Sequence, residues 1–135
     1  MIQGMSHVAI WVTDQDEALS FYTEKLGFEV RTDTVIEGFR WLTISTPEQP
    51  NLELVLMKPF ASPMMDQETV DALMTLIRKG AMANGVLSTN NCRQTYEELK
   101  AKGVEFLAPP EERPYGIEAV MRDNSGNWFS LTEPK

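Results

Sequence analysis

His7, the only histidine of the chain, lies in a stretch whose side chains alternate in character. Over residues 6–14, small apolar side chains alternate with a second set formed by His7, Ala9 and Trp11. This period of two predicts a half-buried strand with two different faces. An imidazole can bind a metal ion or another ligand, and an indole ring offers a stacking surface. The face that carries both is therefore a candidate binding surface.

Glu53 places a carboxylate inside a second alternating stretch, residues 52–57, whose other members are apolar. An unpaired carboxylate is costly in such surroundings, because burial removes its hydration. We therefore expect either a functional role for Glu53 or a structural ion pair with Arg40 or Arg122.

The same alternation continues along the other predicted strands and assigns further residues to the face of His7 and Glu53. These residues are Trp11, Phe39, Trp41, Met57, Glu118, Trp128 and Ser130. An aromatic-walled cavity with a few polar groups is the usual form of a small-molecule site. We therefore predict that the rings, Met57 and Ser130 bind a substrate or ligand. The alternative is that the tryptophans close the core between the two halves of the chain.

The elements that must position these residues follow one order twice: strand, helix, strand, strand, strand. The first copy covers about residues 5–57 and the second about 84–132, with a helical insertion over about 58–83. The predicted strands are 6–14, 28–35, 39–45, 52–57, 85–89, 104–108, 116–122 and 128–132, and the predicted helices are 14–26, 66–79 and 91–102. A Pro-rich loop is predicted after residue 108, through Pro109, Pro110 and Pro114. This internal repeat predicts a single α+β domain over residues 1–135. Its two βαβββ modules form a curved, half-barrel mixed sheet with helices on the convex side.

Capping residues mark the start of two of these helices. Asp14 is followed three residues later by Glu17, and Asn91 is followed three residues later by Gln94. In both pairs, the first side chain is expected to accept a hydrogen bond from the first turn of the helix.

Composition excludes several function classes. The chain has 135 residues, with 12 Lys and Arg against 20 Asp and Glu, which gives a net charge of −8. Such a balance argues against a nucleic-acid surface, because phosphate binding needs clustered cations. One cysteine, Cys92, excludes an internal disulfide framework. No signal peptide and no apolar segment of membrane-spanning length is found, so a cytoplasmic protein is expected.

Several stretches together resemble the vicinal oxygen chelate superfamily, the fold of glyoxalases, bleomycin-resistance proteins and extradiol dioxygenases. They are residues 7–12 (HVAIWV), 18–28 (ALSFYTEKLGF), 52–55 (LELV), 96–104 (YEELKAKGV) and 122–127 (RDNSGN). The resemblance covers nearly the whole chain, and it implies the two-module fold described above. It also implies a homodimer, because members of the superfamily often pair modules between chains.

The resemblance further implies where a metal would bind. In the metal-dependent members, four side chains hold a divalent ion such as Zn²⁺, Ni²⁺, Mn²⁺ or Fe²⁺. His7 and Glu53 match the first two positions. The third position falls on Asn84, or on Ala83 after a shift of one residue, and the fourth falls on Ser130, where a glutamate is usual.

Two functions from different classes follow from the resemblance. The first is a metal-dependent lyase, isomerase or dioxygenase, with the ion on His7, Glu53 and Glu118 and with Glu53 or Glu118 moving a proton. The second is a metal-free protein, like the bleomycin-resistance branch, that sequesters a planar or cationic compound such as an antibiotic. In that case the tryptophans stack on the ligand and the two glutamates counter its charge.

Overall fold

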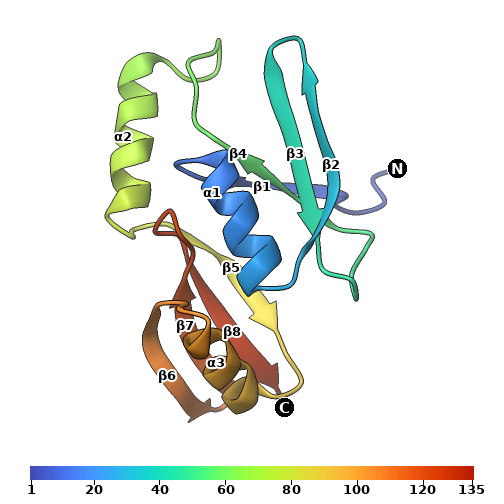
Figure 1. Ribbon diagram of the computed structural model, residues 1–135, viewed down its shortest axis with the longest axis vertical. Coiled ribbons are helices and arrows are strands. Elements are labelled where there is room, and N and C mark those ends of the chain that lie inside the picture. Colours follow the sequence, from blue (N-terminus) through green and yellow to red (C-terminus); the bar gives the residue numbers. More distant parts are fainter. The chain divides into compact units, whose positions relative to one another are not determined.

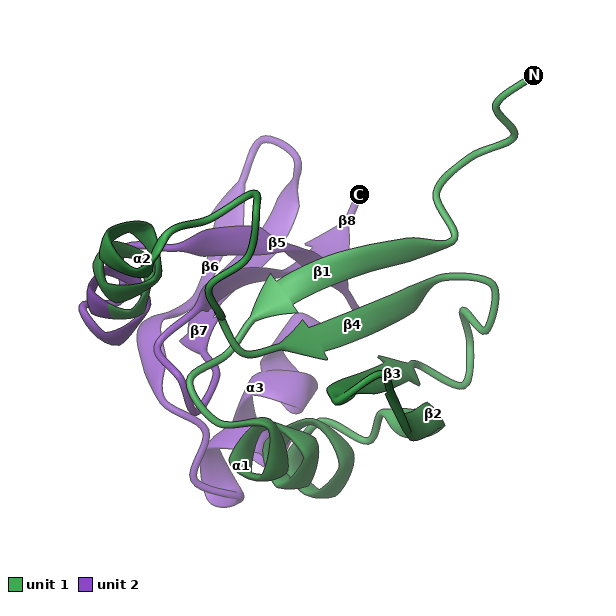
Figure 2. Cartoon of the chain, turned by 90° about the horizontal axis from the view of Figure 1, so that it is seen from above, with its two compact units in different colours: residues 1–74 green, residues 75–135 purple.

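The computed structural model describes residues 1–135, which form two compact units, residues 1–74 and residues 75–135 (Figure 2). Each unit contains one four-stranded mixed sheet built in the order strand, helix, strand, strand, strand (Figure 1). The α+β class and the two βαβββ modules are thus confirmed. The boundary between the units falls within α2 (Gln67–Arg78), the helix of the predicted insertion.

The sheet of unit 1 has the strand order β1-β4-β3-β2. Its strands are β1 (His7–Trp11), β2 (Glu29–Ile36), β3 (Phe39–Ser45) and β4 (Glu53–Met57). Strand β1 runs parallel to β4, with His7 opposite Glu53 and Trp11 opposite Met57. Because paired residues point to the same side of a sheet, these four side chains share one face. The predicted alternation is therefore confirmed on β1 and β4.

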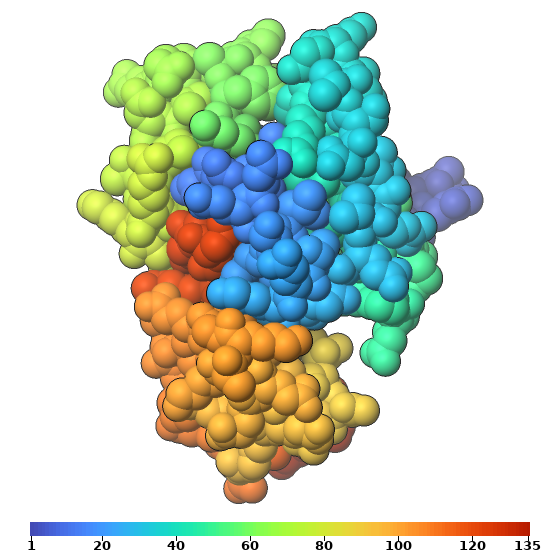
Figure 3. Space-filling view, viewed as in Figure 1, coloured from blue at the N-terminus to red at the C-terminus, as the bar shows by residue number.

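The other face of this sheet is the core of unit 1. Its side chains Ile10, Leu42, Ile44 and Leu56 are at most 2% exposed. Helix α1 (Gln15–Ser20) and the π-helical turn η1 (Phe21–Lys25) cover this face and are drawn in blue in Figure 3. The Gln15 side chain donates a hydrogen bond to the Leu56 carbonyl oxygen (2.9 Å), which ties α1 to β4.

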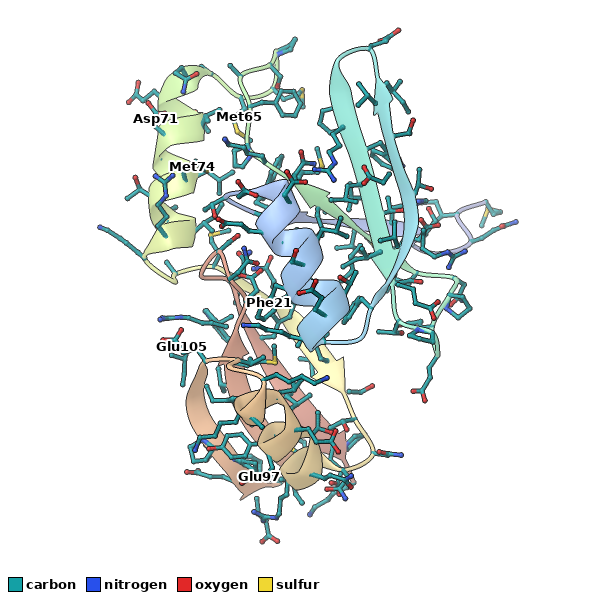
Figure 4. All side chains as sticks on the ribbon, in the orientation of Figure 1. Phe21, Met65, Asp71, Met74, Glu97 and Glu105 are labelled. Atoms are coloured by element: carbon teal, nitrogen blue, oxygen red, sulfur yellow. The ribbon has the colours of Figure 1, made fainter.

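Both predicted helix caps are present. The Glu17 amide donates to Asp14 Oδ1 (2.8 Å) at the start of α1, and the Gln94 amide donates to Asn91 Oδ1 (3.0 Å) at the start of α3 (Cys92–Ala101). The helix predicted over residues 14–26 differs in its second half, which winds as η1. There Phe21, labelled in Figure 4, and Tyr22 are buried.

The sheet of unit 2 has the strand order β5-β8-β7-β6. Its strands are β5 (Ala83–Ser88), β6 (Phe106–Arg113), β7 (Gly116–Arg122) and β8 (Trp128–Pro134). Strand β5 runs parallel to β8, and β7 runs antiparallel to both β6 and β8. Helix α3 contacts β6, β7 and β8. The core face of this sheet carries Ala119, Met121, Phe129 and Leu131, each at most 4% exposed.

The prediction for β6 was wrong at its C-terminal end. A strand over 104–108 followed by a Pro-rich loop was expected, whereas β6 extends to Arg113 and includes Pro109 and Pro110. Proline cannot donate a ladder hydrogen bond, and it is tolerated at edge strands and bulges. Strand β6 is an edge strand, and its register with β7 shifts between Ala108 and Glu111. These two features accommodate the prolines.

The last turn of α2 lies against the β7–β8 turn of unit 2. Asp123 Oδ1 accepts hydrogen bonds from the amides of Ser125, Gly126 and Asn127, which fixes this turn. A Cβ atom at Gly126 would collide with the carbonyl oxygen of Ile77 in α2. Gly126 therefore allows a close approach of two backbone segments, and its φ of 118° is one that side chains disfavour.

None of the helices is both long and apolar enough to cross a membrane.

Candidate functional site

The face of unit 1 opposite its core is named here the open face of unit 1. Register places the side chains of His7 and Trp11 on it from β1, Phe39 and Trp41 from β3, and Glu53 and Met57 from β4. His7 is exposed, and the other five are half-buried. The His7 and Trp41 rings are in contact, with centroids 5.8 Å apart and planes at 47°, and the Phe39 ring lies 5.3 Å from that of Phe60. The open face thus presents clustered rings with accessible surface.

Glu53 lies beside this ring cluster, and its side chain is 21% exposed. Its Oε1 accepts a hydrogen bond from the Thr43 hydroxyl (2.6 Å), and its Oε2 lies 3.6 Å from His7 Nε2. The second nitrogen of that imidazole, Nδ1, is 2.8 Å from Ser6 Oγ.

The expected alternative for Glu53, an ion pair with an arginine, is not found. Arg40 pairs with Asp16 (2.6 Å) and Asp33 (2.9 Å). Arg122 pairs with Glu105 (3.7 Å), which is labelled in Figure 4. Glu53 therefore provides a carboxylate next to aromatic rings without an arginine to neutralise it.

Unit 2 has its own open face, opposite the core residues of its sheet. Register places Glu118 and Val120 of β7, Trp128 and Ser130 of β8, and Val86 of β5 on it. Glu118 accepts hydrogen bonds from Ser130 Oγ (2.5 Å) at Oε2 and from the Tyr115 hydroxyl (2.6 Å) at Oε1. These bonds, that from Ser130 foremost, lower the pKa of Glu118. A general base works best with a pKa near the working pH, so this environment favours a fixed charge over proton transfer.

A sequence comparison identifies the family. Residues 4–131 match the model of the Glyoxalase/Bleomycin resistance protein/Dioxygenase superfamily. The chain belongs to this superfamily. The resemblance seen in the sequence is thereby confirmed.

Several proteins resemble this superfamily member over nearly its full length. The crystal structure of UcmS2 is 51% identical, with a TM-score of 0.92, and the match covers 98% of this chain and 99% of that chain. The crystal structure of TnmS3, an antibiotic binding protein from Streptomyces sp. CB03234, is 26% identical, with a TM-score of 0.79 and coverage of 99% and 98%. The uncharacterized protein YurT of Bacillus subtilis (strain 168) is 31% identical over 93% of this chain and 94% of its own.

The residues at the superfamily's metal positions do not fit a divalent ion. His7 and Glu53 provide two donors, and no third His, Cys, Asp or Glu gathers with them into a group that could hold a metal. Zn²⁺ and related ions usually require three or four protein donors. Asn84 directs its amide nitrogen to Asn127 Oδ1 (2.7 Å), and Ser130 directs its hydroxyl hydrogen to Glu118.

The predicted site residues lie on one face of each of the two sheets. The open face of unit 1 carries Trp11, Phe39, Trp41 and Met57 together with His7 and Glu53, and the open face of unit 2 carries Glu118, Trp128 and Ser130.

Two hydrogen-bond donors to the glutamates were not predicted as site residues. Thr43 falls on the same face as Trp41 by alternation, so its position was available from the sequence. Tyr115 lies between two strands, where no periodic signal assigns it a direction.

Proposed function

We propose that this protein binds a small molecule with a planar aromatic body, such as an antibiotic, and sequesters it without a metal ion. The observation that carries this proposal is the contact between His7 and Trp41 (5.8 Å) on the open face of unit 1, beside the Glu53 carboxylate. The resemblance to TnmS3, an antibiotic binding protein, supports the same function.

The open face of unit 1 has the chemistry that such a ligand needs. Stacking between aromatic rings contributes about 0.5–1.5 kcal/mol beyond the burial of their surface. A cation placed over an indole ring gains a similar amount, and more when water is excluded. Because Glu53 has no arginine partner, it can counter a positive charge on the ligand. A planar cation therefore fits this face better than a planar anion.

Calorimetric titration should distinguish this function from a metal-dependent one. We expect proflavine, a planar cation, to bind the wild-type protein, and we expect Zn²⁺, Ni²⁺ and Mn²⁺ to bind weakly because the donor set is incomplete. Elemental analysis of protein purified without chelators should accordingly give well under one metal ion per chain. Tight stoichiometric metal binding that His7→Ala abolishes would contradict the proposal.

That contrary result would favour the second candidate function, a metal-assisted lyase or isomerase. The observation in its favour is that His7 and Glu53, which match two of the superfamily's metal positions, lie opposite each other on β1 and β4. With Glu118 engaged by Ser130 and Tyr115, Glu53 is the stronger candidate for moving a proton in such an enzyme.

We also propose that the protein acts in the cytoplasm as a homodimer. Each sheet ends in two edge strands, β1 and β2 in unit 1 and β5 and β6 in unit 2. Exposed edges favour pairing with another chain. Light scattering at micromolar concentration should give the mass of two chains, and a monomer mass would contradict this proposal.

A further inference from the structure

Three hydroxyl groups form a chain of hydrogen bonds that ends at the Glu118 carboxylate. Ser130 donates to Glu118 Oε2 (2.5 Å) and Tyr115 donates to Oε1 (2.6 Å). Ser130 Oγ also lies 2.7 Å from Thr132 Oγ1. Since the one hydroxyl hydrogen of Ser130 is used toward Glu118, Thr132 must be the donor in that second bond.

The cluster of Glu118, Tyr115, Ser130 and Thr132 therefore retains hydrogen-bond acceptors but no free donor. The carboxylate, the Tyr115 oxygen and the Thr132 oxygen retain lone pairs, whereas all three hydroxyl hydrogens are engaged. Tyr115 is 53% exposed and Glu118 is half-buried, whereas Ser130 and Thr132 are buried, so Glu118 and Tyr115 are the accessible acceptors. A ligand can gain hydrogen bonds here only by bringing its own N–H or O–H groups.

The Glu118 carboxylate forms no ion pair with the neighbouring Arg113. Arg113, whose positive charge helps to lower the pKa of Glu118, forms its own ion pair with Glu111 (3.1 Å). The two hydroxyl donors favour the ionised form of Glu118. The cluster therefore holds a fixed negative charge without an ion-pair partner of its own.

Two apolar side chains flank Ser130 on this face. Val86 of β5 and Val120 of β7 both pair with Ser130, one on each side, and Val86 is 68% exposed. Trp128, two residues before Ser130 on β8, lies on the same face. A ligand with an apolar or aromatic body and a donor group at one end matches this order of side chains.

We propose that the Glu118 end of the open face of unit 2 binds ligands through a primary or secondary ammonium group whose N–H bonds point at the Glu118 carboxylate. This inference concerns a face of unit 2 and goes beyond the proposed function, which concerns the open face of unit 1. It assigns positioning roles to Tyr115 and Ser130, which hold the carboxylate in place and leave its other lone pairs open to the ligand.

A series of probes with one ring system tests the inference on the wild-type full-length protein. The probes are 1-naphthylmethylammonium, its N,N,N-trimethyl analogue, 1-naphthalenemethanol and 1-naphthoate, titrated by calorimetry at pH 7. We expect the primary ammonium to bind about tenfold more tightly than the trimethyl analogue, because hydrogen bonds to a charged group are among the stronger ones. Naphthoate should bind most weakly. This comparison does not depend on any variant being folded.

Substitution then tests which carboxylate is responsible. Glu118→Gln should weaken binding of the primary ammonium about tenfold and change binding of the alcohol less than twofold. The matched control is Glu97→Gln, which removes an equal charge from an exposed position on α3 of the same unit (Figure 4). It should leave the order of affinities unchanged.

The possible failures are distinguishable. Equal binding of all four probes, or an ammonium preference that survives Glu118→Gln, would overturn this inference alone. Failure of all four probes to bind would also overturn this inference, whereas the proflavine titration decides the proposed function separately.

Discussion

Gly126→Ala should lower the free energy of unfolding by about 3 kcal/mol or more, since two penalties act together. The first is conformational, because residue 126 has a φ of 118°, a region that side chains disfavour. The second is steric, because the new Cβ would collide with the carbonyl oxygen of Ile77 at the end of α2. A backbone oxygen cannot move aside as a flexible side chain can. Urea denaturation of the full chain measures the change.

Gly85→Ala is the matched control for this prediction. Gly85 lies in the same unit and has a φ of 143°, but a Cβ added there would meet no atom within 4 Å. It carries the conformational penalty alone, so we expect a loss of about 1–2 kcal/mol. If the two variants lose the same stability, the contact between α2 and the β7–β8 turn does not contribute as the structure indicates.

Trp41→Ala should weaken binding of a planar cation such as proflavine by tenfold to a hundredfold. Burial of a large aromatic side chain against a ligand contributes about 1.5–3 kcal/mol, and each 1.4 kcal/mol is a factor of ten in affinity. Trp41 is half-buried on the open face of unit 1 and is the residue whose ring contacts His7. Its loss removes the indole surface that contacts His7, which in turn lies beside Glu53. Calorimetric titration gives the dissociation constants.

Two variants show whether this loss is specific to the ring. Trp41→Phe keeps an aromatic surface and should recover most of the affinity. Val35→Ala removes an exposed apolar side chain from the opposite face of the same sheet, where Val35 pairs with Arg40 on the neighbouring strand, and it should leave binding unchanged. Equal losses in Trp41→Ala and Val35→Ala would place the ligand elsewhere.

Much of the fold was predictable because local signals agreed with the tertiary structure. The alternation at residues 39–45 marks β3 with its observed bounds, and Asp14 and Asn91 form the caps that their spacing predicts. The extension of β6 was not predictable in this way. Proline usually ends a strand, and only the position of β6 at the sheet edge, with a bulge, makes Pro109 and Pro110 acceptable. That position depends on the whole sheet and not on the segment itself.

For the candidate site, the sequence predicted on which face of the sheet each side chain lies, but not which groups it contacts. Period-two alternation placed Glu53 and Trp41 on one face, and the register confirms that placement. Which group meets the Glu53 carboxylate depends on how far β3 and β4 are offset, and the structure gives Thr43 and His7 instead of an arginine. Similarly, Tyr115 reaches Glu118 across a turn whose path no periodicity encodes.

The buried thiol of Cys92 allows the motions of unit 2 to be timed. Its Sγ donates a hydrogen bond to the Leu131 carbonyl oxygen (3.4 Å), and its side chain has no exposed surface. Burial raises the pKa of this thiol, and alkylating reagents react with the thiolate. A maleimide can therefore attack only in the brief intervals when α3 separates from β8, as amide hydrogens exchange only when a segment opens. Because the chain has a single cysteine, the alkylation rate of the unmodified protein reports how often unit 2 opens.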